Sequence, residues 1–155
     1  MRRFQLQRNF AQEEFMSEKF RSLTREQVMG IIPHRPPTFF VESITVQPGE
    51  WAVGIMTDWT NDPVLGTRKT FPQPLIIEAL SEAGAVAILG LPENKGKLAV
   101  LTGVNNFKFG QPIERREEVI LEAELGKMRS NYGKGHVRAS VNGEIRAEGE
   151  ISFGY

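Results

Sequence analysis

The most continuous apolar stretch of the chain lies near its middle. It begins at Pro74, whose fixed φ suits the first turn of a helix, and it ends at Gly90, a common residue at helix C-termini. A helix that is apolar almost all round must be buried on most sides. Its polar exceptions, Glu78, Ser81 and Glu82, are spaced three and four residues apart and therefore share one face. Because burying an unpaired carboxylate is costly, we expect that face to meet water, a partner or a substrate.

Alternating apolar and polar positions predict strands on both sides of this helix. Before it, strands are expected over 38–47 and 51–58; after it the pattern is β throughout, beginning with a strand over 97–109 that bends near Gly103. Asn142-Gly143 is a strong hairpin signal between the last two strands. Clean alternation is typical of an antiparallel sheet with one buried face. We therefore predict an α+β fold with a six-stranded antiparallel sheet wrapped around one long helix, at about residues 74–90.

The N-terminal part of the chain divides into an arm and the start of the domain. Residues 1–22 mix charged residues with spaced phenylalanines, which predicts an amphipathic arm that packs on the domain or on a partner chain. Thr24 with Gln27 forms a capping-box pattern, so a short helix is expected there, ended by Pro33. The predicted organisation is an arm over 1–22 followed by a single domain over 23–155.

Composition narrows the classes of function. The chain has 155 residues, with 19 basic and 19 acidic residues, so its formal net charge is zero and a general nucleic-acid binder is not expected. It has no cysteine and two distant histidines, His34 and His136, so no metal site is expected. The central helix is too short and too charged to span a bilayer, and the N-terminus has no apolar signal-peptide core. We expect a cytoplasmic protein without a cofactor.

Several motifs in order resemble the FabZ-type 3-hydroxyacyl-ACP dehydratases, which have the hot-dog fold. The resemblance covers about residues 23–153 and depends on the combined order of the motifs. The matching stretches are Leu23-Thr24-Arg25-Glu26-Gln27, Ile31-Ile32-Pro33-His34-Arg35, Asn61-Asp62-Pro63, Leu75-Ile76-Ile77-Glu78-Ala79-Leu80, the run from Gly84 to Lys97, Gly133-Lys134-Gly135 and Val141-Asn142-Gly143-Glu144.

The resemblance implies a homodimer or a trimer of dimers whose joined sheets hold an acyl-thioester tunnel at the protomer interface. In that family a loop histidine takes the proton α to the thioester carbonyl, and a helix glutamate of the neighbouring protomer helps the β-hydroxyl leave. Glu78 matches the glutamate, and Glu82 stands where the family has Gln. Residues 61–74 replace the family's Gly-His-Phe-Pro-Gly loop and contain no histidine. A general base is worth on the order of 10²–10⁴-fold, so ordinary dehydration is doubtful. His34 matches another family position, and we interpret it as a residue that orders the connector.

The candidate site is therefore centred on Glu78, with Glu82 as a second carboxylate that would raise the pKa of one member of the pair or form a salt bridge. Arg68 and Lys69 occupy the altered loop, where they are either solvated charges or ligands for the phosphopantetheine of a carrier. We assign the nearby aromatic residues to substrate binding as well, although the strand up to residue 109 is expected to be core or dimer interface. These aromatic candidates are Phe71, Phe107 and Phe109.

Three functions remain open from the sequence. The first is a divergent dehydratase relative that binds or processes (3-hydroxy)acyl thioesters, carried on ACP or CoA, in fatty-acid or polyketide-type metabolism. The second is an acyl-thioester hydrolase that uses Glu78. The third is a non-catalytic partner or scaffold of an active dehydratase, in a heteromer docked through the arm. A basic surface for an acidic acyl carrier protein would be formed by Lys108, Arg115, Arg116, Arg129, Lys134 and Arg138.

Overall fold

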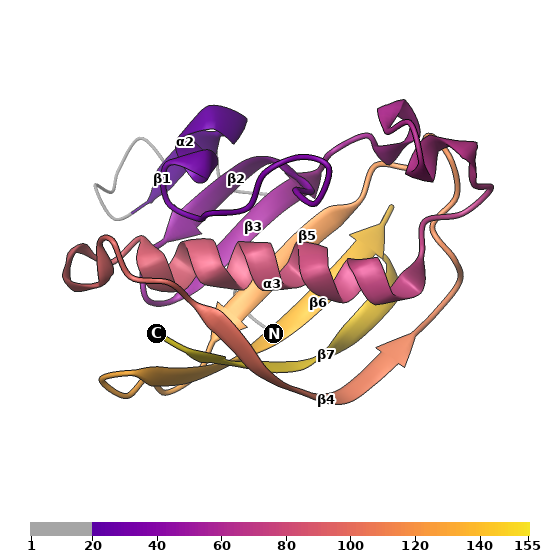
Figure 1. The fold of residues 1–155 in the computed structure, drawn as a ribbon. Helices are drawn as coiled ribbons and strands as arrows, with labels where there is room; N and C mark the ends of the chain where they lie inside the picture. The colour runs from indigo at the N-terminus through magenta and orange to yellow at the C-terminus, as the bar shows by residue number, and fades with distance from the viewer. Residues whose placement is uncertain (1–19) are drawn as a thin grey trace.

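The computed structural model describes residues 20–155, in which a curved sheet wraps one long helix (Figure 1). Three short 3₁₀ helices lie in the connections of this part, at Trp59–Asn61, Leu65–Thr67 and Pro92–Asn94. The helices and strands are β1 (Arg21–Thr24), α2 (Arg25–Met29), β2 (Val41–Gln47), β3 (Trp51–Met56), α3 (Gln73–Leu89), β4 (Val100–Phe109), β5 (Ile120–Leu125), β6 (Tyr132–Val141) and β7 (Glu144–Gly154).

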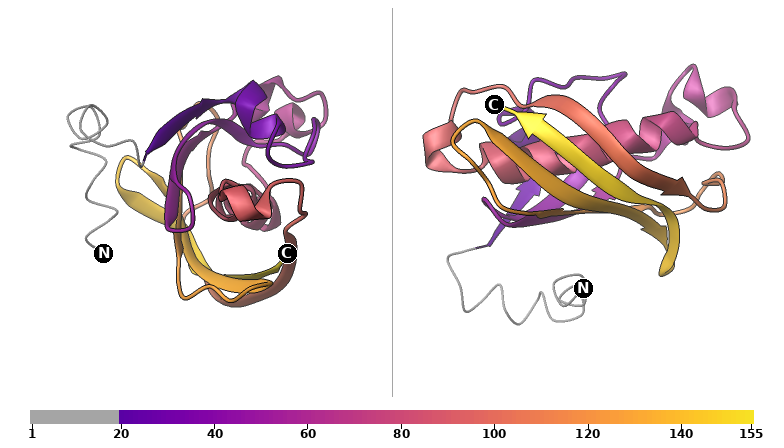
Figure 2. Two further views of the ribbon diagram at one scale, coloured as in Figure 1. Left: turned by 90° about the vertical axis from the view of Figure 1, so that its left-hand side faces the viewer. Right: turned by 90° about the horizontal axis from the view of Figure 1, so that it is seen from below.

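The sheet has seven strands in the order β1-β2-β3-β5-β6-β7-β4, and every neighbouring pair is antiparallel. Seen along α3, it curls around the helix (Figure 2). The predicted architecture is confirmed, but the count of six strands is wrong by one. The additional strand is β1, four residues that pair with β2 immediately before a capping box. It was missed because four residues carry too little alternation to signal a strand.

Helix α3 lies within one residue of its predicted bounds, and its burial explains why the sheet curves around it. All residues from Ala79 to Leu89 are buried. The sheet comes so close that a Cβ built on Gly84 would lie 2.8 Å from Cζ of Phe153 and 3.3 Å from Cδ1 of Ile151. The absence of a side chain at Gly84 therefore lets β7 pack directly on the helix.

The structure also tests the predicted capping box, hairpin and strand bend. The capping box of Thr24 and Gln27 is present, but α2 ends at Gly30 rather than at Pro33. Asn142 and Gly143 have φ values of 49° and 81°, as a tight hairpin requires. The bend predicted in the strand over 97–109 corresponds to two register shifts in β4.

The predicted arm lies almost wholly outside the described residues. Its last two residues, Arg21 and Ser22, belong to β1. The preceding residue, Phe20, packs its ring against Trp51 with the ring centroids 5.3 Å apart.

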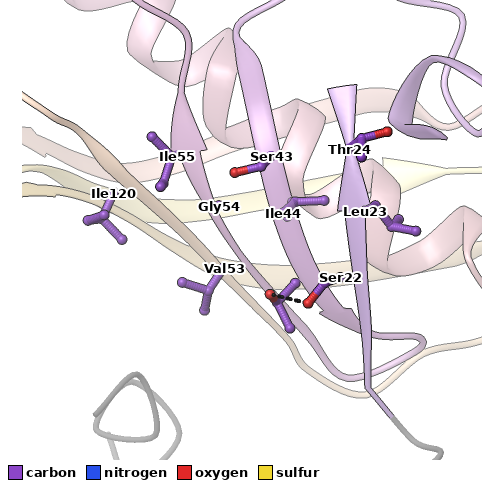
Figure 3. Close-up of a pocket in the computed structure, with 10 residues that line it drawn as sticks. Ser22, Leu23, Thr24, Ser43, Ile44, Val53, Gly54, Ile55 and Ile120 are labelled. Atoms are coloured by element: carbon purple, nitrogen blue, oxygen red, sulfur yellow. Dashed lines mark hydrogen bonds between the residues drawn. The ribbon is translucent and has the colours of Figure 1, made fainter. Parts of the chain in front are cut away.

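A groove of about 460 Å³ lies over β1, β2, β3 and β5 (Figure 3). Val53 and Ile55 line it, opposite Thr45 and Ser43 on the neighbouring strand. A hydrogen bond between the Ser22 and Thr45 hydroxyls, 3.3 Å long, closes one end. None of the charged residues of α3 lines this groove, so the candidate site must be sought elsewhere.

Candidate functional site

Glu78 is paired with His34 of the same chain. His34 Nε2–H donates to Glu78 Oε1 over 3.0 Å, although the two residues are 44 positions apart. Glu78 lies in the second turn of α3, and His34 lies in the connector between α2 and β2. The interpretation of His34 as a residue that orders the connector therefore missed a direct contact with the candidate catalytic carboxylate.

The connector between α2 and β2 is held in place next to His34 by hydrogen bonds. The guanidinium of Arg35 donates to the carbonyl oxygens of Met29, Ile32 and His34 at 2.9, 3.0 and 2.7 Å. These three bonds close the short segment after α2 into a compact turn. The imidazole is thereby held over the N-terminal half of α3.

The His34–Glu78 hydrogen bond changes the pKa of both partners. It raises the pKa of His34 above 6.5, against the opposing effect of burial, and it lowers the pKa of Glu78 below 4.5. The pair is therefore an imidazolium–carboxylate pair at mildly acidic pH. The Glu78 side chain keeps 34% of its surface exposed, whereas His34 Nδ1 is buried without a hydrogen-bond partner among residues 20–155. Glu78 is therefore the more exposed member of the pair, since 24% of the His34 side chain is exposed.

Glu82 lies one turn further along α3 and is fully buried, with 0% exposure. Glu82 Oε1 accepts the Phe40 backbone N–H over 2.9 Å and is not paired with Arg68 or Lys69, whereas a salt bridge to an interface arginine stays a prediction. Its other oxygen, Oε2, has no hydrogen-bond partner within the described chain. Burial is the main cause that raises the pKa of Glu82 to about 8, and the charge of Glu78 adds to it, so one carboxyl of the pair is raised as predicted.

Ser81 completes the polar set of α3 without joining this site. Its hydroxyl donates to the Ile77 carbonyl oxygen of the preceding turn, over 2.7 Å. This bond satisfies the hydroxyl inside the helix. Ser81 is therefore not available as an activated nucleophile.

The three aromatic candidates lie in two different places. Phe71 is 1% exposed and packs edge-on against Phe40, with Trp59 on another side. Phe107 and Phe109 lie on β4 with their rings 5.6 Å apart. Phe71 therefore packs against Phe40, the residue whose backbone N–H binds Glu82. Phe107 and Phe109 lie on an edge strand. Their contact with a substrate stays a prediction.

The basic candidates are partly brought together. Arg68 and Lys69 are exposed in the loop before α3, and Arg115 donates to the Gly66 and Arg68 carbonyl oxygens, at 2.5 and 3.1 Å. Arg68, Lys69 and Arg115 are thereby brought together at the loop before α3, and we call these three residues the basic cluster. The other predicted basic residues lie on different strands or turns; Arg138, for example, binds Glu122 over 2.9 Å on β5. Only part of the predicted basic surface is therefore a single patch.

Residues 20–155 contain neither a metal-binding cluster nor a membrane-spanning helix. No group of three or more histidine, aspartate or glutamate side chains there is placed to hold a metal ion. No helix in this range combines the length and hydropathy needed to cross a bilayer.

Comparison with known proteins defines the family. No family model matches the chain. A 3-hydroxyacyl-[acyl-carrier-protein] dehydratase FabZ from a Roseiflexus species is 40% identical over 136 residues, which cover 84% of this chain and 95% of the relative. The chain belongs to the FabZ family of 3-hydroxyacyl-[acyl-carrier-protein] dehydratases. The FabZ of Thermomicrobium roseum is 41% identical over 132 residues, covering 82% of this chain and 89% of the relative. The resemblance inferred from the motifs is thus confirmed.

Solved structures support the same fold at lower identity. The dehydratase heterocomplex ApeI:P from Xenorhabdus doucetiae matches with a TM-score of 0.67 and 16% identity, over 82% of this chain and 89% of that chain. An HP0420 homologue from Helicobacter felis matches with a TM-score of 0.63 and 17% identity, over 83% and 86% of the two chains. These likenesses confirm the hot-dog fold of this FabZ-family chain.

The role of His34 was the main omission of the sequence reasoning. Its partner is 44 residues away, and no local pattern links them. The signal that was present is that only two histidines exist in the chain, and one of them lies in a motif shared with the family. Which of them reaches α3 depends on the path of the connector, which spacing alone does not determine.

Proposed function

We propose that this protein acts on 3-hydroxyacyl thioesters carried by an acyl carrier protein, in fatty-acid synthesis, and that Glu78 exchanges a proton with the substrate. The carrying observation is the Glu78 carboxylate, which is held by His34 at 3.0 Å and still has about a third of its surface exposed. Family membership supports the substrate class, and the geometry supports the residue.

The reaction is the loss of water from the acyl chain. The α C–H bond breaks and its proton goes to a base, while the β C–O bond breaks with its electron pair and the departing oxygen takes a proton from an acid. A double bond forms between the α and β carbons. Because its pKa is lowered, Glu78 is ionised, so its carboxylate takes the α proton and then gives this proton to the departing oxygen, while His34 holds the carboxylate in position. A positioned acid or base contributes on the order of 10²–10⁴-fold.

One observation favours a second candidate, in which the chain is half of a heteromeric dehydratase. His34 Nδ1 is buried, and His136 Nε2 binds Glu148 Oε1 on β7, over 3.3 Å. The loop over 61–73 contains no histidine. A second subunit that brings a histidine to the exposed side of Glu78 would complete an acid–base pair. The chain would then supply Glu78 and depend on its partner for the base.

One assay separates these functions. Purified protein is incubated with 3-hydroxyacyl-ACP, and enoyl product and free thiol are both measured, with Glu78→Gln as the matched variant. Enoyl product that is lost in the variant supports dehydration, whereas free thiol supports hydrolysis through Glu78. Activity that emerges only when a FabZ-type subunit with the histidine loop is added supports the heteromer. Activity that survives Glu78→Gln contradicts the assignment of Glu78.

The basic cluster is the part of the surface that we assign to the acidic carrier protein. Arg68 and Lys69 lie in the loop that leads into α3, the helix that carries Glu78, and Arg115 donates to the Arg68 carbonyl oxygen over 3.1 Å. Opposite charge steers association and weakens with salt. Reversal of charge in the double variant Arg68→Glu and Lys69→Glu should weaken binding of acyl-ACP more than binding of acyl-CoA. Lys127→Glu, in the turn after β5, is the matched control.

We assign the exposed edge of β4 to the binding of a second copy of the chain. β4 is ten residues long, has β7 as its one neighbour in the sheet within residues 20–155, and exposes Val100, Val104 and Phe109. An exposed apolar edge strand pairs readily with another strand. Pairing of two β4 strands would join two sheets and give the homodimer implied by the family. Sedimentation or light scattering tests this state.

A further inference from the structure

Glu82 is a buried carboxyl for which the proposed reaction has no use. Its side chain is 0% exposed, and its single hydrogen bond comes from the Phe40 backbone N–H. Oε2 finds no partner among residues 20–155. An ionised carboxylate in such a place needs a counter-charge or several donors, and one backbone N–H is not enough.

The charged groups around Glu82 do not provide that counter-charge. Glu78 lies on the same helix, His34 faces it from the connector, and Arg25 faces it from α2. The Arg25 guanidinium is already engaged with the Thr57 hydroxyl at 2.6 Å and with the Val41 carbonyl oxygen at 3.2 Å. His34 is bound to Glu78. Glu82 is therefore the group that remains protonated in neutral solution, in agreement with a pKa of about 8 caused mainly by burial.

We propose that Glu82 is a positioning residue that works as an uncharged carboxylic acid and sets both the geometry and the charge of the His34–Glu78 pair. Its geometric part acts through the connector. Oε1 of Glu82 anchors Phe40 at one end of residues 34–40, while Glu78 holds His34 at the other end. Two carboxyls one turn apart on α3 thus hold the two ends of a single segment.

Its electrostatic part depends on its protonation. When Glu82 loses its proton, a second negative charge lies beside His34 and Glu78. That charge favours the imidazolium form of His34 and opposes the ionised form of Glu78. The protonation of His34 and Glu78 therefore differs between pH values below and above the pKa of Glu82. The kinetic consequence rests on the proposed function, whereas the effect on His34 is measurable without any substrate.

The first experiment follows the His34 imidazole by NMR from pH 5 to pH 10, with selectively labelled histidine. In the wild-type protein we expect the His34 signals to show a second inflection near pH 8, caused by ionisation of Glu82. Glu82→Gln keeps an oxygen that accepts the Phe40 N–H but cannot ionise, so this inflection should disappear. Glu122→Gln is the matched control, because Glu122 is also a buried glutamate but is bound to Arg138 on the sheet. Its removal should leave the His34 curve unchanged.

The second experiment measures unfolding against pH. A carboxyl whose pKa is raised in the folded state binds a proton that the unfolded chain has already lost, so stability falls as pH rises between about 4.5 and 8. The unfolding equilibrium constant of the wild type should therefore rise relative to that of Glu82→Gln by up to about tenfold per pH unit in this interval. Above it the ratio should level off.

The third experiment separates anchoring from charge. Glu82→Met removes the acceptor for the Phe40 N–H, so it should disturb the His34 signals at every pH. If this variant does not fold, Glu82→Gln and Glu122→Gln still decide the question. In the activity assay, the profile of kcat against pH should show an inflection near pH 8 in the wild type that is absent in Glu82→Gln.

Two results would overturn the inference. One is a His34 titration curve and an unfolding profile that are the same in the wild type and in Glu82→Gln. The other is loss of the second inflection in Glu122→Gln, which would assign it to a different group. If no turnover of any acyl thioester is found, the proposed function fails, but the NMR and unfolding measurements still test the role of Glu82.

Discussion

The two halves of helix α3 differ in what surrounds them. From Gln73 to Glu78, every residue except Ile76 keeps some exposed surface, whereas from Ala79 to Leu89 all are buried. The sheet curls around α3 (Figure 2), and the second half is the part whose side chains are enclosed. One continuous apolar segment therefore has two tasks: its second half holds the fold together, and its first half presents a carboxylate.

Glu82 lies just beyond the boundary between these halves, and this position explains why two glutamates one turn apart behave differently. Glu78 keeps partial exposure and a charged partner, so its pKa is lowered. Glu82 is enclosed and has a backbone N–H instead, so its pKa is raised. The difference comes from the protein around each residue, since the residue type and the helix are the same.

The largest expected effect is on activity, in the open half. Glu78→Gln should reduce kcat for the acyl thioester by about 10²–10⁴-fold, because the amide cannot exchange a proton. Stability should change little, since Gln still accepts a hydrogen bond from His34. Steady-state kinetics and urea unfolding are measured on the same preparation. If kcat falls only in proportion to the fraction of folded protein, the open half of α3 contributes to stability as well, and the division of the helix is contradicted.

The next effect is on stability, in the enclosed half. Ile88→Ala removes a side chain that is 0% exposed in the core, so the free energy of unfolding should fall by about 2–5 kcal/mol. Urea unfolding measures this loss. The fraction that remains folded should keep its activity, because Ile88 is about three turns from Glu78. A specific loss of kcat in folded protein would contradict the division of the helix.

A smaller effect is expected at the edge of the sheet. Val104 is 40% exposed on β4, so Val104→Lys should disturb the monomer little, while it places a charge where two sheets would join. The proposed dimer should dissociate at a higher protein concentration in this variant than in the wild type, as sedimentation velocity would show. If the site needs the second protomer, activity should fall with dimer content. Ile145→Lys, an exposed apolar residue on β7, is the matched control.

Much of the fold could be predicted because its signals are local. Pro74 and Gly90 bound the helix, and Asn142-Gly143 specifies the hairpin, in each case through the φ preferences of the residues themselves. The missed strand β1 shows the limit of such signals. Its four residues become a strand because β2 offers a free edge, which the segment itself does not encode.

The site could be predicted only in part, for the same reason. The apolar pattern of the helix predicted the polar face that carries Glu78, and the resemblance to the family implied its role; both depend on a short stretch of sequence. His34 is brought to it by a turn that three Arg35 hydrogen bonds close, and Glu82 receives a backbone N–H from the far end of the same connector. The sequence left two alternatives for Glu82, a raised pKa and a salt bridge. Its burial with a single backbone N–H donor favours the first, because burial raises the pKa of this carboxyl to about 8.

The smallest expected effect is the pH dependence of the His34–Glu78 pair. Since the pKa of His34 is raised in the folded state, its contribution to stability is complete below about pH 6.5 and is lost as pH rises through the folded pKa. Since the pKa of Glu78 is lowered, its contribution is present above about pH 4.5 and is lost as pH falls through the folded pKa. Both are complete between these values. A double-mutant cycle with His34→Gln and Glu78→Gln should therefore show its largest coupling energy between about pH 4.5 and 6.5.

The coupling should stay below about 1 kcal/mol, because a third of the Glu78 side chain is open to water and screening reduces the attraction. Urea unfolding of the four proteins of the cycle, at half-unit steps from pH 3 to pH 9, measures it. A coupling energy that is constant across this range would mean that the contact at 3.0 Å is a neutral hydrogen bond. The open half of α3 would then differ from the enclosed half in exposure alone, and His34 would have no influence on the charge of Glu78.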